Sequence, residues 1–242
     1  MANTSSEEPG TRLSPVPYGF PRRRFIDELR GKRLQLGARQ TLAREGDDTL
    51  NIHVLRSGWA FRFKSLEDGR RQILAFLLPG DLIGVLEPGA HMYPYGVETL
   101  TESEVITLPR QRLLDAAAQD ASLALDLFWL AANERRQAEE RLLSVGRRSA
   151  DERMAALILH VYASAAERDL ADAQGQVPFP VSQQHIADAL GLSLVHTNKT
   201  LRRLLALGVY ELAGGRLRVV DAAALGDIGL HREVAVPGRP LF

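Results

Sequence analysis

The chain has no cysteine among its 242 residues. This absence excludes disulfides, thiolate zinc sites, cysteine-held iron–sulfur clusters and thiol-based redox sensing. No apolar run comes near the roughly 20 residues that a transmembrane helix needs, and the first ten residues are polar and acidic, unlike a signal peptide. We therefore expect a cytoplasmic protein with no membrane partner.

The chain also has no formal net charge at pH 7, because 30 basic residues balance 30 acidic ones. The overall charge therefore gives no sign of a nucleic-acid partner. The chain is 45% hydrophobic and long enough to bury a sizeable core, and its length is typical of two domains. A preference for nucleic acid would have to come from a local segment.

The histidines do not provide a metal site. No two of them have the spacing of paired ligands such as H-x-H or H-x-x-x-H. This spacing argues against a structural metal and against a cupin-type metalloenzyme, which would need clustered ligands. We expect no metal, no cofactor and no enzymatic activity, and we leave open a small-molecule effector of unknown identity.

The most informative segment is residues 181–205, VSQQHIADALGLSLVHTNKTLRRLL, which has the pattern of a helix-turn-helix. Ser182 is placed to cap a first helix, Gly191 supplies a left-handed turn, and Ser193 is placed to cap a second helix. Helical spacing turns one face of the second helix inward, through Thr197, Leu201 and Leu204. The segment therefore predicts a module that reads DNA.

The opposite face of the second helix is expected to enter the major groove. Its outward residues are Leu194, Val195, His196, Asn198, Lys199 and Arg202. Asn198 can pair with adenine, Lys199 can donate to guanine or phosphate, and His196 adds a base or phosphate contact. Leu194 and Val195 are placed to touch thymine methyl groups. An ordinary helical hairpin in a globular core is the alternative interpretation.

A β-hairpin directly after the second helix favours DNA binding over that alternative. Residues 209–212 and 216–220 have the pattern of two strands around a turn at 213–215, which together form a wing. Between Val181 and Val220, five cations stand against two anions. This local excess suits phosphate contacts, with Arg216 as the candidate in the wing.

The N-terminal half has the period-two pattern of short strands. Residues 1–21 are rich in Ser, Pro, Gly and Glu, and we expect a mobile arm there. Within 22–120, alternating apolar residues are interrupted by turns at 67–69 and 79–81. This pattern predicts a small β-barrel or jelly roll.

A long helix is predicted next, within a dimerisation helix and hinge at 121–148. Asp120 is placed to cap it, and it should extend to Val145 with a bend at Gly146. Its apolar stripe consists of Leu123, Leu127, Leu130, Ala138, Leu142 and Val145. Since its first turns are apolar nearly all round, we expect it to pack on the β domain and on a second copy of the chain. A buried core helix of a monomer is the alternative.

A further helix begins the C-terminal domain. Residues 149–152, Ser-Ala-Asp-Glu, form a capping-box sequence. We therefore predict a winged helix-turn-helix domain over 149–228, followed by a tail at 229–242.

This order of elements resembles the Crp/Fnr family of bacterial transcription regulators. The resemblance covers about residues 22–228 and includes REGD at 44–47, GDLIG at 80–84, ADERMA at 150–155 and the helix-turn-helix. It is strongest in the last, where FixK-like and other Fnr-type members share V-H-x-N-[RK]. The resemblance implies an α+β fold with a cyclic-nucleotide-binding-like β-roll, and a homodimer on palindromic double-stranded DNA. RNA polymerase would be a further partner if the protein is an activator.

Departures from the family pattern bear on the effector. Cyclic-nucleotide-binding relatives have a glutamate after the GDxIG run and an Arg-Ser pair downstream, whereas this chain has Val85 and Tyr95-Gly96. A buried phosphate needs such an arginine or a ring of amide donors, so cyclic AMP is not expected. The missing cysteines exclude the iron–sulfur cluster of the oxygen-sensing branch.

The alternative is a small-molecule or haem-dependent gas sensor, whose β-roll ligand would control DNA binding. The candidate effector pocket consists of Trp59, Phe61, Val85, His91, Tyr93, Tyr95 and Trp129. Core packing is the first interpretation of the two tryptophans and Phe61, and a hydrogen-bonded or surface histidine that of His91. A ligand-binding module with a degenerate helix-turn-helix is a further alternative, against which the intact caps argue.

Overall fold

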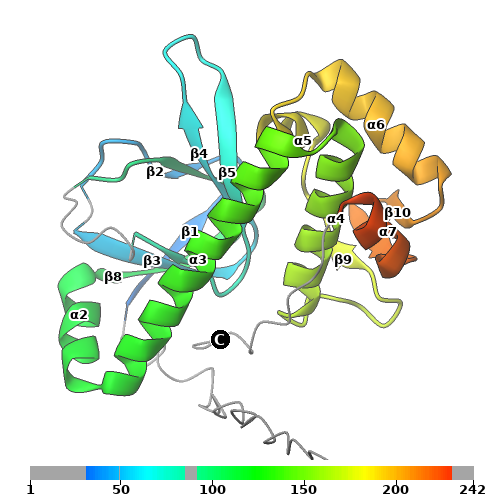
Figure 1. The fold of residues 1–242 in the computed structure, drawn as a ribbon. Coiled ribbons are helices and arrows are strands. Elements are labelled where there is room, and N and C mark those ends of the chain that lie inside the picture. The colour runs from blue at the N-terminus through cyan, green and yellow to red at the C-terminus, as the bar shows by residue number, and fades with distance from the viewer. Residues whose placement is uncertain (1–30, 49, 85–91, 231–242) are drawn as a thin grey trace, which may run out of the picture.

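The structure, a computed structural model, describes residues 31–48, 50–84 and 92–230. A β-roll comes first, and a long helix leads from it to a helical region with a small sheet (Figure 1). The predicted α+β fold class is confirmed. The predicted arm, Val85, His91 and the tail beyond 230 lie outside the described residues.

The β-roll consists of two four-stranded antiparallel sheets. Their strands are, in order, β1 (Lys32–Leu36), β8 (Ser103–Pro109), β3 (Asn51–Ser57) and β6 (Leu82–Ile83), then β2 (Thr41–Ala43), β7 (Gly96–Thr99), β4 (Ala60–Ser65) and β5 (Arg71–Leu77). Alternate residues of β5 are buried, as the period of two requires. Leu55 and Val105 of the first sheet share one buried cluster with Val97 of the second, so the sheets face each other.

Two helices follow the β-roll, α2 (Arg110–Gln119) and α3 (Ala121–Arg147). Asp120 caps α3 as predicted, because its carboxylate accepts a hydrogen bond of 2.9 Å from the amide of Ser122. The helix ends at Arg147, one residue after the predicted bend at Gly146, and Arg148 is extended before the next helix begins.

The predicted apolar stripe of α3 divides between two environments. Leu123 and Leu130 are buried, and Leu123 joins the cluster that contains Ile52 of β3 and Leu108 of β8. Leu142, by contrast, is 75% exposed. Figure 1 shows α3 lying along the β-roll. At 100° per residue, Leu142 lies about 100° around the helix from Leu123, so it faces away from the side that is packed. A stripe that is continuous in the sequence is therefore covered only in part.

The C-terminal region begins with α4 (Ala150–Ala166), which has the predicted capping box between Ser149 and Glu152. After it come β9 (Val177–Pro178), α5 (Gln183–Leu190), α6 (Leu194–Ala206), β10 (Tyr210–Ala213), β11 (Arg216–Val219) and α7 (Ala222–Ile228). The two strands β10 and β11 form the predicted wing hairpin. The sequence did not predict β9, a third strand that pairs with β11 and is only two residues long.

The core of the C-terminal region reaches into the β-roll. Met154 and Ile158 of α4 share a buried cluster with Leu204 of α6, and this cluster also takes in Trp59 and Leu78 of the β-roll. The two parts therefore have a common apolar boundary. Among the described helices, none is both long and apolar enough to cross a membrane.

Candidate DNA-binding site

Local hydrogen bonds shape the helix-turn-helix as the sequence predicts. The hydroxyl of Ser182 accepts from the amide of His185 at 3.2 Å, and the hydroxyl of Ser193 accepts from the amide of His196 at 3.2 Å. Gly191 has a φ of 65°, the left-handed conformation that favours glycine. These contacts start α5 and α6 and fix the tight turn between them.

The second helix has the two faces that its spacing predicts. Thr197, Leu201 and Leu204 are buried, whereas Val195 is 79% exposed. The exposed residues of its outer side include Leu194, Val195, His196, Lys199 and Arg202. Asn198 differs from them, because it is half-buried and its amide oxygen is shielded without a partner in the described structure. That amide would have to rotate before both of its ends could meet a base.

The basic residues of this region are not equally available to DNA. Arg203 forms an ion pair with Asp151 at the start of α4. Arg216 donates to Asp172 at 2.6 Å and to the carbonyl of Gln176 at 2.9 Å, so the predicted wing contact is engaged inside the protein.

Two basic side chains of α6, the expected recognition helix, are not engaged in this way. Within the described ranges, Lys199 and Arg202 form no hydrogen bond or ion pair. Both are exposed on α6. They are therefore the cations best placed to meet phosphate or base edges.

The described members of the predicted effector pocket are divided among separate parts of the packing. Trp59 packs into the shared cluster with α4, and Phe61 lies under the ring of His185 at 5.2 Å. Tyr93 and Tyr95 form an edge-on pair at 6.0 Å within the core of the β-roll. Trp129 is half-buried on α3. Periodicity identified buried aromatic residues correctly but could not tell core packing from the lining of a pocket.

Other residues line a shallow, open depression of about 270 Å³ between β4 and α3. It is lined by Arg62, Ala131, Glu134, Arg135 and Ala138. Arg62 forms an ion pair of 2.6 Å with Glu134, and its guanidinium lies 4.8 Å from the centre of the Tyr95 ring. Burial and the nearby charge of Arg62 lower the pKa of Arg141 to about 10. The cleft is thus strongly charged.

The described residues include no group of three or more His, Asp or Glu side chains that could hold a metal ion. His53 illustrates the role of one scattered histidine. Its Nδ1 lies 2.8 Å from the hydroxyl of Thr107, and burial lowers its pKa to about 4. It is a satisfied histidine within the β-roll.

Comparison with known proteins identifies the family. The protein-family model of the cyclic nucleotide-binding domain matches residues 33–120, and the family model of the Crp-like helix-turn-helix domain matches residues 152–228. The nitrogen fixation regulation protein FixK of Bradyrhizobium diazoefficiens is 33% identical over 196 residues, which is 80% of each chain. The chain belongs to the Crp/Fnr family. It is a DNA-binding transcription regulator and not an enzyme.

Other similarities support this assignment. The transcriptional activator FnrA of Stutzerimonas stutzeri is 28% identical to this Crp/Fnr protein, over 83% of this chain and 81% of FnrA. The solved structure of FixK2 from Bradyrhizobium japonicum superposes with a TM-score of 0.73 at 27% identity, covering 85% of this chain and 99% of FixK2.

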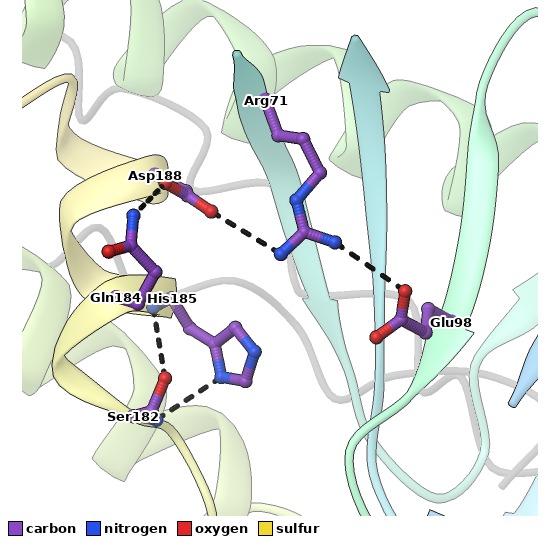
Figure 2. A network of polar contacts seen from close by, with 6 residues as sticks. All are labelled: Arg71, Glu98, Ser182, Gln184, His185 and Asp188. Carbon is purple, nitrogen blue, oxygen red and sulfur yellow. Dashed lines mark hydrogen bonds and ion pairs between the residues drawn. The ribbon is translucent and has the colours of Figure 1, made fainter. Parts of the chain in front are cut away.

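His185, in the first helix of the helix-turn-helix of this Crp/Fnr regulator, has two roles that sequence reasoning missed. Its ring packs on Phe61 of the β-roll. Its Nδ1 also accepts a hydrogen bond of 3.2 Å from the amide of Ser182, which completes a second capping box (Figure 2). Burial, and the charge of Arg71 next to it, lower the pKa of His185. The spacing Ser-x-x-His was the available signal, but histidine is not the usual partner in such a box.

Proposed function

We propose that this Crp/Fnr regulator binds palindromic duplex DNA as a homodimer in the cytoplasm, with α6 of each protomer in a major groove. The outer face of α6 carries the proposal. Its exposed side chains combine apolar groups at 194–195 with the unpaired cations Lys199 and Arg202. Such a surface offers methyl contacts, base contacts and phosphate contacts on one helix.

One exposed face of α3 supports the homodimer. Leu125, Phe128, Leu142 and Leu143 are between 50% and 75% exposed. At 100° per residue they lie within an arc of about 100°, opposite the side that packs on the β-roll. A monomer gains nothing from so large an apolar face in water, whereas a second copy of α3 would cover it.

We further propose that no cyclic nucleotide controls this protein. Val85 and Tyr95 replace the carboxylate and guanidinium of cyclic-nucleotide-binding relatives, and Tyr95 is buried against Tyr93. Arg62, whose guanidinium lies over the Tyr95 ring, is already paired with Glu134. In the second candidate function, control by another small ligand, that ligand would lie in the open depression beside the Arg62–Glu134 pair.

Selection of bound sites from random duplex DNA tests the function directly. We expect enriched sites with two inverted half-sites, whose centres lie about one helical turn, roughly 34 Å, apart. Enrichment of single half-sites would contradict the dimer, and no enrichment would contradict specific binding. Transcription from a selected site with added RNA polymerase then distinguishes an activator from a repressor.

A further inference from the structure

Arg71 of β5 lies between one carboxylate of the β-roll and one of the helix-turn-helix. Its Nη1 is 3.5 Å from Oε2 of Glu98 on β7, and its Nη2 is 3.5 Å from Oδ2 of Asp188 on α5 (Figure 2). The Asp188 side chain is only 14% exposed. A single guanidinium therefore joins the sensor-like domain to the first helix of the DNA-binding motif.

The surroundings of Arg71 hold this bridge in place. Its guanidinium carbon lies 5.5 Å from the ring centre of Phe61 and 5.4 Å from that of Phe63, so two aromatic side chains support it from the β-roll. The other carboxylate oxygen of Asp188 accepts a hydrogen bond of 2.7 Å from the side-chain amide of Gln184. The Arg71 guanidinium and the Asp188 carboxylate are therefore each held in place by a further contact.

The end of α5 is fastened to the same strand. The side-chain amide of Gln72 donates to the carbonyl of Ala189 at 2.9 Å, and Arg153 of α4 donates to the carbonyl of Leu190 at 3.1 Å. Carbonyls in the last turn of a helix lack partners within the helix, so these two donors supply the hydrogen bonds that the carbonyls of Ala189 and Leu190 would otherwise lack. The β-roll therefore contacts α5 at two places, the Asp188 side chain and the C-terminal end of the helix.

The position of α5 determines that of α6. The two helices are joined by the tight turn at Gly191, and Ile186 of α5 lies in the same buried cluster as Leu201 and Leu204 of α6. A rotation of α5 on the β-roll would carry the recognition helix with it. In a dimer, both recognition helices must fit half-sites at a fixed separation, so a small rotation affects affinity.

We propose that Arg71 is a positioning residue for DNA binding, which holds the helix-turn-helix on the β-roll by bridging Glu98 and Asp188. The inference rests on the DNA-binding function and adds to it the contact that sets the angle of the motif. It assigns a role to β5 of the sensor-like domain, which itself carries no DNA-reading residue.

The test uses the full-length protein and a duplex chosen by the selection described above. Arg71→Gln removes the positive charge and keeps a shorter polar side chain. Asp188→Asn removes the negative charge with little change of shape and keeps an oxygen for Gln184. We expect each to weaken DNA binding about three- to tenfold, and the double variant to be no weaker than the worse single one. Anisotropy of labelled DNA, at a temperature where every variant is folded, provides the affinities.

Two controls separate positioning from charge loss and from instability. Arg70→Gln removes the same charge one residue away, where the Arg70 side chain pairs with the hairpin residue Asp68, and we expect an affinity within twofold of wild type. Arg71→Lys keeps the charge and should recover at least half of the lost affinity.

Four outcomes would overturn the positioning role. They are wild-type affinity in Arg71→Gln, additive effects in the double variant, no recovery by Arg71→Lys, and an equal loss in Arg70→Gln. A lowered melting temperature with unchanged affinity also reduces Arg71 to a structural residue. If the wild type itself selects no DNA, the proposed function fails, which is a separate result.

Discussion

Arg62 of β4 and Glu134 of α3 form an ion pair of 2.6 Å at the edge of the cleft between the β-roll and the long helix. The Arg62 side chain is only 17% exposed, and it also stacks over Tyr95. A buried cation that already has a carboxylate and an aromatic face is poorly available to a phosphate. The pair therefore bears directly on which effectors the cleft can take.

Cyclic AMP and cyclic GMP are expected not to bind. The side chain of Tyr95 cannot replace a guanidinium, and a phosphate near Glu134 would meet a like charge. Calorimetric titration of the purified protein with each nucleotide should show no heat of binding, and neither nucleotide should tighten DNA binding. Micromolar binding with a phosphate-dependent enthalpy would contradict the prediction and would mean that Tyr95 does not align with the arginine of the relatives.

The double variant Leu125→Glu/Phe128→Glu is expected to be monomeric. These side chains are 57% and 73% exposed, so charges there should leave the folded protomer intact and prevent a second helix from covering the stripe. Charges at Leu123 or Leu130, which belong to the predicted apolar stripe but are buried, would instead disturb the packing of the protomer. Sedimentation velocity distinguishes the two assembly states.

A matched control for the dimer is Leu114→Glu on α2. Leu114 is 48% exposed but lies outside α3, so this variant should sediment as the wild type does. A wild-type protein that sediments as a stable monomer and still binds palindromic DNA tightly would show that the exposed face of α3 has another role.

Replacing Asn198 or Lys199 by Ala is expected to cost on the order of 1–3 kcal/mol per half-site and to relax preference at one base position. Lys199 should show the clearer effect, because it is fully outward, whereas the amide of Asn198 must rotate. Competition binding against single-base variants of the selected site measures this. If both variants weaken every sequence equally, neither side chain reads bases.

Arg216→Ala provides the contrast in the wing. We expect it to weaken all sequences alike and to reduce the salt dependence of binding, as loss of a phosphate contact would. Because Arg216 pairs with Asp172 in the structure, this variant should also lower the melting temperature. Loss of preference at a single base position would instead assign Arg216 to base reading.

Acid is expected to destabilise the β-roll through His53. Burial lowers its pKa to about 4, whereas its unfolded value is about 6.5, so the unfolded state binds more protons between these pH values. The stability that neutral His53 contributes is complete above about pH 6.5 and is lost as pH falls toward 4, by on the order of 3 kcal/mol. Urea unfolding of wild type and His53→Asn at pH 7 and pH 5 measures the loss, which should be smaller in the variant. Parallel pH profiles would contradict this assignment.

The sequence alone determined the features that depend on contacts three or four residues apart. Ser182, Ser193 and the capping box at 149–152 act through neighbouring backbone amides, so their residue types were sufficient to predict where the helices begin. The buried face of α6 followed from helical periodicity in the same way. The order of the predicted elements then gave the family resemblance.

Tertiary structure decided which faces meet. The α3 stripe is covered at Leu123 and exposed at Leu142 because the two residues lie about 100° apart around the helix and only one side of the helix packs on the β-roll. Arg71 and Asp188 belong to different domains, and nothing in the local pattern of either segment indicates that the two would meet. Periodicity shows which residues of an element share a face, but only packing of the whole chain determines what that face contacts.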